Sequence, residues 1–294
     1  MHDGELIRNL RMGRKLTQSQ LAMGICSKTA LVGMENGTVK KISFLTLKLF
    51  LNRLNITLAE YEWLRNLLDE PEKERLQRQA MSRVFEAEFD VYKAIANNRK
   101  KYRQTDDIYY LVLNIGILWQ VGHHQFKEMQ LDMLRYESDC IEEYFNELRE
   151  FGHFELEIIA KWPFLFSDTY IESNYARIKK KMNQFGGLRS YERYVFIFQL
   201  NLIRQYIAKR RYKKARAINQ DMHSLLREQD TKAVIYEQLQ TKFYHYLLKF
   251  ALREQVKEEN LIELFSVIDY TLGHNQKNQM EQEYQTLKMY IQNK

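Results

Sequence analysis

Residues 17–37 read TQSQLAMGICSKTALVGMENG, and this stretch decides how the N-terminal part of the chain folds. Thr17 has the character of a helix N-cap, because its hydroxyl can accept a hydrogen bond from an unpaired backbone amide of the first turn. Gly24 stands where the backbone must bend, and Ser27 offers a second N-cap. The stretch therefore predicts two short helices joined by a tight turn, the second over residues 28–35.

The second helix has one apolar side and one polar side. The side chains that we expect to pack in a small core are Cys26, Leu31 and Met34. The opposite side carries Lys28, Thr29 and Val32, which can reach phosphates, base edges and the methyl group of thymine. This division favours a helix that lies in a groove of DNA.

The segments around this pair of helices complete a predicted five-helix domain over residues 1–68. A leucine stripe marks the first helix, and its basic residues, which could rest on a phosphate backbone, are Arg8, Arg11, Arg14 and Lys15. Lys40 and Lys41 follow the second helix of the pair in an exposed loop and are further candidate phosphate contacts. From composition alone, these lysines and arginines would be interpreted as solvated surface charges. Their positions next to the helix-turn-helix motif favour contact with DNA instead.

Two further N-caps are expected in this domain. Ser43 precedes a helix whose inward side chains we expect to be Leu45, Leu49 and Phe50, and Thr57 precedes a helix that turns Tyr61 inward. The charge of the domain agrees with a nucleic-acid partner. Residues 1–68 hold ten Lys or Arg against five Asp or Glu, a balance of +5 out of the +7 of the whole chain.

The sequence resembles a known family. Residues 4–68 are similar to the helix-turn-helix domain of lambda-repressor-like (XRE) regulators through GELIRNLRMGRKLTQSQLA, SKTALVGMENG and LTLKLFLNRLNITLAEY. The spacer LAMGICS is one residue shorter than in generic members, and the short form resembles the Rgg/GadR/MutR group of Gram-positive peptide-sensing regulators. The runs NRLNITLAEY and EEYFNELREFGHFELEIIAKWPFLF extend this resemblance over nearly the whole chain.

The resemblance implies functional residues and partners. In the family, a side chain at the position of Gln18 clamps a DNA phosphate, and the repeats of Rgg-like regulators bind short hydrophobic pheromone peptides. A homodimer is expected, because one recognition helix covers a few base pairs while two related by a two-fold axis reach half-sites about one DNA turn apart. The expected partners are thus double-stranded DNA, a signalling peptide and a second copy of the chain.

Composition predicts an almost wholly helical protein. The 294 residues include two prolines and eleven glycines, so few residues would break a helix, and no sheet is expected. No apolar run approaches the roughly 20 residues of a membrane span, and the start MHDGELIRNL lacks an apolar signal core, so we expect a cytoplasmic protein without a membrane partner. Cys26 and Cys140 form no metal or redox spacing.

The clearest domain boundary is the sequence DEPE at residues 69–72, because proline ends one helix and opens another. We expect residues 69–98 to form a linker and one long connecting helix. Residues 99–294 then form a helical-repeat domain, a solenoid similar to tetratricopeptide repeats, with about 40 residues in each pair of helices. Helices are predicted over residues 106–121, 125–150, 153–166, 168–184, 190–209, 212–228, 232–252, 258–272 and 275–292.

A peptide groove is expected on the concave side of this solenoid. The helix over residues 190–209 carries on one stripe the candidate peptide contacts Tyr194, Ile197, Asn201, Arg204 and Gln205. The helix over residues 232–252 likewise carries Gln238, Thr241 and Lys242. Tyr175 is a further aromatic candidate, for which packing in the core is the stronger reading. For the residues on these two helices, the alternative to peptide contact is a solvent-exposed outer face of the solenoid.

The sequence supports a DNA-binding regulator, with two alternatives left open. No enzyme constellation is present: the pair His123–His124 has no HExxH or Cys/His context, and no cofactor or metal is expected. The hypothesis is a homodimer in which a peptide shifts the spacing of the two recognition helices. One alternative is a helical-repeat scaffold for protein–protein interaction. The other is a DNA-binding regulator without a ligand.

Overall fold

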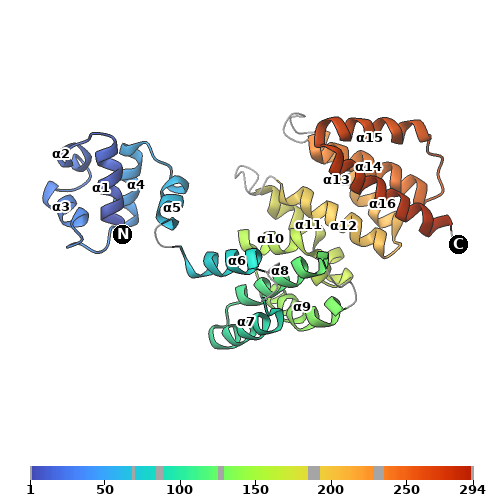
Figure 1. The fold of residues 1–294 in the computed structure, drawn as a ribbon, viewed down its shortest axis with the longest axis horizontal. Coiled ribbons are helices and arrows are strands. Elements are labelled where there is room, and N and C mark those ends of the chain that lie inside the picture. The colour runs from blue at the N-terminus through green and yellow to red at the C-terminus, as the bar shows by residue number, and fades with distance from the viewer. Residues whose placement is uncertain are drawn as a thin grey trace. The chain divides into compact units, whose positions relative to one another are not determined.

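The computed structural model describes residues 2–67, 70–83, 89–124, 129–184, 193–227 and 235–292. Within these ranges every regular element is a helix (Figure 1), so the predicted all-α class is confirmed. The elements are α1 (Asp3–Gly13), α2 (Gln18–Ala22), α3 (Lys28–Glu35), α4 (Phe44–Leu54), α5 (Leu58–Asn66), α6 (Glu72–Arg83), α7 (Val91–Thr105), α8 (Tyr109–His124), α9 (Met129–Glu147), α10 (His153–Lys161), the 3-10 helix η1 (Pro163–Leu165), α11 (Asp168–Gln184), α12 (Tyr194–Ala208), α13 (Tyr212–Arg227), α14 (Ile235–Ala251), α15 (Glu258–Leu272) and α16 (His274–Gln292).

The chain divides into two compact units. The first contains residues 1–94 and 116–125, and the second contains residues 95–115 and 126–294. Five helices, α1 to α5, pack within residues 2–67 of the first unit, around a core in which the fully buried side chains are Ile7, Leu21, Leu31, Phe50 and Leu54. This core is what holds α2 and α3 in their orientation.

The predicted N-caps of this unit are confirmed. The hydroxyls of Thr17, Ser27, Ser43 and Thr57 each accept a hydrogen bond from the backbone amide three residues further along, at the starts of α2, α3, α4 and α5. Because each of these bonds satisfies a first-turn amide that has no partner in its helix, the caps set where the four helices begin.

The expected inward side of α4 was partly wrong. Leu45 is 68% exposed and Leu49 is 40% exposed, whereas Phe50 is fully buried as predicted. The side chains of α4 that meet the core follow Phe50 at steps of one and four, at Leu51 and Leu54. A small domain has one core, so an amphipathic helix on its edge buries a single stripe and leaves the next one in solvent.

The single connecting helix predicted after residue 71 was also wrong. α6 ends at Arg83, Phe89 and Asp90 are not helical, and α7 begins at Val91. The carboxylate of Asp90 accepts a hydrogen bond of 2.9 Å from the amide of Lys93, which is an N-cap interaction that starts a new helix. Apolar residues at helical spacing occur in the sequence on both sides of Asp90, and this periodicity predicts one continuous helix.

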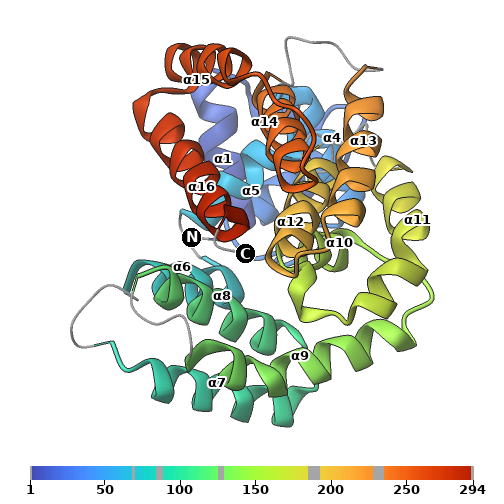
Figure 2. The ribbon, with the colours of Figure 1, turned by 90° about the vertical axis from the view of Figure 1, so that its right-hand side faces the viewer.

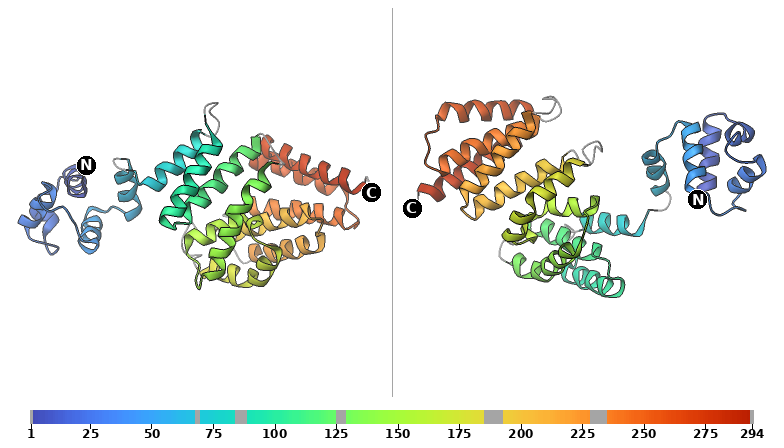
Figure 3. Two further views of the ribbon diagram at one scale, coloured as in Figure 1. Left: turned by 90° about the horizontal axis from the view of Figure 1, so that it is seen from below. Right: turned by 180° about the vertical axis from the view of Figure 1, so that it is seen from behind.

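The second unit is a stack of antiparallel helical hairpins, best seen in Figure 2 and from two further sides in Figure 3. Consecutive helices α12, α13 and α14 pack on one another, as do α15 and α16. Helices two places apart also pack, namely α10 on α12, α12 on α14 and α14 on α16. This contact pattern is that of an α-solenoid, in which each hairpin buries its apolar face against the next.

Most expected breaks between these helices are found close to where the sequence placed them. Arg210 and Gly273 take left-handed backbone conformations, with φ of 57° and 89°, between the helices that they separate. The break expected at residues 122–124 was wrong, because α8 continues through His124. The breaks expected at Gly186–Gly187 and around Asp230 lie outside the described residues.

Candidate functional site

The helix-turn-helix predicted from residues 17–37 is present. Thr17 and Gln20 form a reciprocal capping box at the start of α2, in which the Gln20 side chain accepts from the Thr17 amide at 2.7 Å. Gly24 bends the chain with a φ of 70°, a conformation that favours glycine. The hydroxyl of Ser27 accepts from the Ala30 amide at 3.1 Å and starts α3. These local interactions fix the angle between α2 and α3.

The predicted DNA-contacting side chains of α3 lie at the surface of the first unit. Lys28 and Thr29 are exposed, at the N-terminus of α3, and Val32 one turn later is half-buried. Arg14 after α1 and the loop residues Lys40 and Lys41 are exposed as well. The N-terminus of a helix with a nearby lysine favours an anion such as a phosphate group.

Gln18 and Arg11 both bond to Glu35, and the exposed position expected for Arg11 is wrong. The amide of Gln18 donates to Glu35 Oε2 at 2.8 Å, so this half-buried side chain ties α2 to the end of α3. Arg11, expected on the exposed basic side of α1, is buried and donates to both carboxylate oxygens of Glu35, at 2.7 and 2.9 Å. A guanidinium that meets a carboxylate in two parallel bonds forms a rigid, strong pair.

Glu35 is therefore the residue that joins the helices of the DNA-binding candidate. Burial by itself would raise the pKa of Glu35, but the hydrogen bonds from Arg11 and Gln18 and the charge of Arg11 outweigh burial and lower this pKa below its usual value. Glu35 thus stays ionised. The sequence offered no signal for this pair, because its members are 24 residues apart.

Gly4 allows α1 to approach α3 closely. A Cβ atom built on Gly4 would lie 1.8 Å from the carbonyl oxygen of Met34 and 2.4 Å from its carbonyl carbon. Backbone atoms cannot move aside as a flexible side chain can. The absence of a side chain at residue 4 therefore sets how near the two helices lie.

The predicted peptide contacts on α12 are largely used to hold helices together. The amide of Asn201 donates to the carbonyls of Ala160 and Lys161 at 2.9 and 3.1 Å, and so caps the C-terminus of α10. The hydroxyl of Tyr194 is 3.1 Å from Nε2 of His153. Ile197 is half-buried on the same helix. Buried carbonyls at a helix end need donors, and Asn201 supplies them.

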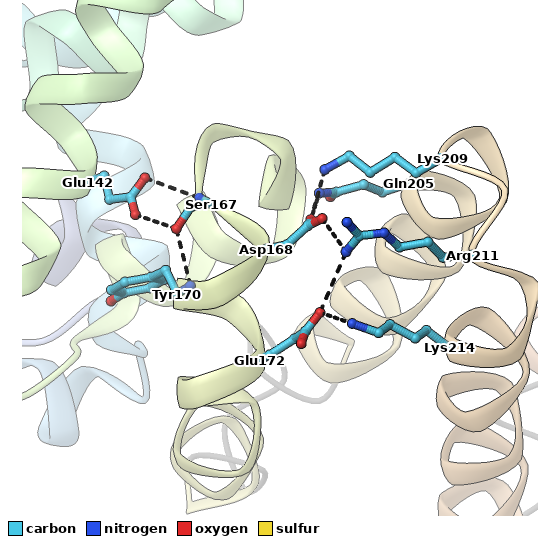
Figure 4. Close-up of polar contacts among 9 residues, drawn as sticks. All are labelled: Glu142, Ser167, Asp168, Tyr170, Glu172, Gln205, Lys209, Arg211 and Lys214. Atoms are coloured by element: carbon cyan, nitrogen blue, oxygen red, sulfur yellow. Dashed lines mark hydrogen bonds and ion pairs between the residues drawn. The ribbon is translucent and has the colours of Figure 1, made fainter.

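Gln205 belongs to a charged cluster at the start of α11, shown in Figure 4. Its amide lies 3.5 Å from Asp168 Oδ1, and the same carboxylate accepts from Lys209 at 2.8 Å and pairs with Arg211 at 2.6 Å. Burial would raise the pKa of Asp168, but the hydrogen bond and charge of Lys209 and the charge of Arg211 prevail and lower it. This cluster holds the start of α11 against the turn between α12 and α13.

Arg204 takes part in a chain of hydrogen bonds across three helices. Its Nε donates to the hydroxyl of Tyr244 at 2.7 Å, and that hydroxyl donates to Glu283 Oε1 at 3.0 Å. Tyr244 is fully buried between α12 and α16, whereas Arg204 keeps an exposed part. Burial raises the pKa of Glu283, against the opposing charge of Arg204 and the hydrogen bond from Tyr244.

Tyr175 packs between helices, in agreement with the prediction that it contributes to the core and not to a peptide groove. Its ring stacks on Phe198 with centroids 5.7 Å apart, and its hydroxyl donates to Asp221 Oδ2 at 2.6 Å. The amide of Gln199 donates to both of these oxygens at 2.9 Å, and Lys179 completes the cluster on Asp221. Tyr175 therefore joins α11 to α12 and α13.

A cavity of about 830 Å³ lies between α13 and α14. Its lining includes the predicted residues Gln238, Thr241 and Lys242, and among the described residues that form it none belongs to α12. The structure thus brings together the α14 candidates and leaves the α12 candidates outside this cavity. The α13 side of the lining lies on a different helix from the predicted stripes and includes Asn219, His223 and Arg227.

No described group of three or more His, Cys, Asp or Glu side chains is arranged to hold a metal ion. Among the described helices, none has both the length and the apolar character required to cross a bilayer.

Comparison with known proteins gives a family match at the N-terminus. The helix-turn-helix family model HTH_3 matches residues 7–61. This range contains α2, α3 and the turn between them. No protein in the curated comparison matches the sequence.

Solved structures match over almost the whole chain. The Streptococcus dysgalactiae SHP pheromone receptor Rgg2 has a TM-score of 0.64 at 16% identity, with 96% of this chain and 98% of that chain covered. The PrgX/cCF10 complex gives a TM-score of 0.71 at 15% identity, with 97% and 98% covered. A bacterial peptide pheromone/receptor complex gives 0.72 at 14% identity, with 97% and 98% covered.

These matches confirm, as a likeness of fold, the resemblance to the Rgg group that the sequence suggested. The protein has a helix-turn-helix segment at its N-terminus and, over nearly its entire length, the fold of the pheromone receptor Rgg2 and of PrgX.

Proposed function

We propose that the protein is a sequence-specific DNA-binding transcriptional regulator whose activity is controlled by a short apolar signalling peptide. The observation that carries the proposal is the exposed N-terminal end of α3, with Lys28 and Thr29, on a helix-turn-helix segment joined to helical repeats of the pheromone-receptor fold. A DNA-binding regulator acts where the chromosome lies, so the cytoplasmic location belongs to the same proposal.

DNA binding would use two kinds of contact. Lys28, Thr29 and Val32 would face base edges and the flanking phosphates, while Arg14, Lys40 and Lys41 would contact phosphates alone. Phosphate contacts give affinity that falls as salt rises, and base contacts give sequence preference. Gln18 would reach a phosphate only by sharing or leaving its hydrogen bond with Glu35.

Peptide binding would use the repeats. The names of the solved relatives describe one as an SHP pheromone receptor and another as a complex of PrgX with cCF10. In this chain, the α14 group of Gln238, Thr241 and Lys242 contains the stronger candidates, because these residues line the α13–α14 cavity. Asn201, Arg204, Gln205 and Tyr175 are engaged between helices.

Control would pass through a homodimer. Two recognition helices related by a two-fold axis would read two half-sites, and a peptide that binds one dimer geometry more tightly would shift the population toward it. The shift cannot exceed the difference in the peptide's affinity for the two geometries.

The experiment is a gel shift with the DNA upstream of the protein's own gene. Lys28→Ala combined with Thr29→Ala should abolish sequence-specific binding and leave the helical circular dichroism unchanged. Lys48→Ala, an exposed lysine of α4, is the control with the same charge change and should bind normally. Sequence-specific binding retained by the double variant would refute the assignment of α3 as the recognition helix.

A selection of random DNA on the purified full-length protein tests the wider proposal. A regulator should enrich one sequence with related half-sites, whereas a protein–protein scaffold would enrich none. Addition of culture supernatant should then change the affinity for the enriched DNA. An unchanged affinity with every supernatant fraction would favour a regulator without a ligand.

A further inference from the structure

The cavity between α13 and α14 is lined by basic side chains. His223 and Arg227 come from α13, and Lys242 and His245 come from α14. Within the part of the chain that the structure describes, no Asp or Glu lines this cavity, and neither Arg227 nor Lys242 forms an ion pair. The cavity therefore presents positive charge that no described carboxylate balances, which favours an anionic ligand.

Two basic residues of α13 outside the cavity are paired with carboxylates. Arg216 pairs with Glu254, and Lys214 pairs with Glu172. Lys213 and Arg227 have no such partner among the described residues, and of these two only Arg227 lines the cavity.

The cavity also contains a buried hydrogen-bond acceptor. Asn219 lines it and is 4% exposed, and its Oδ1 has no hydrogen-bond partner among the described residues. The other end of the same amide donates to the carbonyl of Thr241 at 3.2 Å, which fixes the orientation of the side chain. The Thr241 hydroxyl donates to the carbonyl of Glu237 at 2.7 Å. A ligand that donates an N–H would satisfy Asn219, since buried polar atoms are normally paired.

A ligand with both an N–H donor and a negative charge fits this combination. The C-terminal end of an extended peptide supplies both, because it has a backbone N–H beside a carboxylate. The volume of about 830 Å³ lies within the range of roughly 300–1,000 Å³ that is usual for ligand sites. We infer that the α13–α14 cavity binds the C-terminal carboxylate end of the signalling peptide, an inference that rests on the proposed function.

His245 should make this binding depend on pH. Burial, together with the charges of Lys249, Arg216 and His223, lowers the pKa of His245, and Glu254 opposes them more weakly. His245 is therefore largely neutral at pH 7. A bound carboxylate stabilises the protonated imidazole, so the peptide should bind more tightly as pH falls from 8 to 6, while its own carboxyl group remains ionised.

The experiment uses the full-length protein and a defined probe. The probe is an equimolar mixture of fluorescein-labelled heptapeptides of Leu, Val, Ile and Phe, synthesised once with a free C-terminal carboxylate and once as the C-terminal amide. Retention on immobilised protein is measured for both forms. The free acids should be retained about tenfold more strongly than the amides, and more strongly at pH 6 than at pH 8.

Matched variants locate the effect. Arg227→Gln with Lys242→Gln should remove the preference for the free acid, and His223→Asn with His245→Asn should remove the pH dependence. Lys180→Gln with Lys213→Gln, two exposed lysines outside the cavity, gives the same change in net charge and should retain the preference. A preference that survives the cavity variants or disappears in the control would place the carboxylate site elsewhere.

The outcomes separate this inference from the proposed function. Equal retention of acids and amides would overturn the carboxylate site and leave a peptide-binding regulator intact. Absence of retention of either form would also overturn the site, and the supernatant experiment on DNA affinity would still decide whether a ligand controls the protein.

Discussion

Removal of the Glu35 carboxylate should loosen the helix-turn-helix without altering Lys28, Thr29 or Val32, the predicted base contacts of α3. In Glu35→Ala, Arg11 loses bonds of 2.7 and 2.9 Å and Gln18 loses one of 2.8 Å. The Arg11 side chain is 10% exposed, so its charge would remain buried with one bond, to the carbonyl of Leu16. Breaking a buried ion pair in this way costs about 3–5 kcal/mol.

That cost is large against the stability of a small unit, which is of the order of 5–15 kcal/mol. Native-state hydrogen exchange on the full-length protein is the assay, because it reads the opening free energy of α1 and α3 separately from the repeats. Amides of both helices should exchange roughly 10²- to 10³-fold faster, since 1.4 kcal/mol is a factor of ten. Affinity for DNA should fall, although Lys28 and Thr29 are unchanged.

Two controls sharpen the result. The double variant Arg11→Met with Glu35→Leu removes both charges and should recover most of the protection. Lowering pH should imitate Glu35→Ala: the pKa of Glu35 is lowered in the folded state, so its contribution is complete above the unfolded value of about 4.3 and is lost as pH falls through the folded pKa. Exchange within about fivefold of the wild-type rate in Glu35→Ala would show that the buried ion pair contributes little to the stability of α1 and α3.

Three further changes have defined outcomes. Gly4→Ala should destabilise α1 and α3 by about 1–3 kcal/mol or more, measured by the same exchange, because its Cβ would overlap the carbonyl of Met34; native protection would contradict this. Asp168→Asn should cost the repeats about 0.5–1 kcal/mol in urea unfolding near pH 7, because Lys209 and Arg211 lose their shared partner. The difference from wild type should shrink as pH falls through the lowered pKa of Asp168, and a pH-independent difference would argue against the ion pairs. Gln240→Met should stabilise the repeats by about 1–3 kcal/mol, because Gln240 is 1% exposed and both of its amide atoms lack partners among the described residues; a lower unfolding midpoint would show that the amide is satisfied.

The parts of the fold that could be predicted from sequence are those fixed by neighbouring residues. Thr17 and Ser27 cap helices through bonds to amides three residues away, and such short patterns are visible in the sequence. The same kind of signal at Asp90 was missed, because an apolar stripe on both sides of it indicated continuity. Helical periodicity alone does not distinguish one helix from two that share a face.

The candidate site could be predicted only in part, because its polar side chains choose partners far along the chain. Asn201 bonds to carbonyls about 40 residues earlier, and Gln18 bonds to a carboxylate 17 residues later. The helical periodicity predicts the face of the helix on which each of these side chains lies. It does not predict which residues they bond to. Asn219 and the other α13 residues line the cavity only because α13 packs against α14. No pattern of neighbouring residues in the sequence predicts this packing.

The position of α12 within the stack has a consequence for how such proteins can diversify. Through Asn201, Gln199 and Arg204, this helix bonds to α10, α11 and α14, so a substitution on it alters several hairpins at once. Exposed side chains of the α13–α14 cavity, such as Lys242 and His245, can be exchanged without disturbing those bonds. On the proposal that the cavity binds the signalling peptide, proteins of this fold that bind different peptides should differ more at the cavity than along α12. Peptide specificity would then change while the stack of helices is preserved.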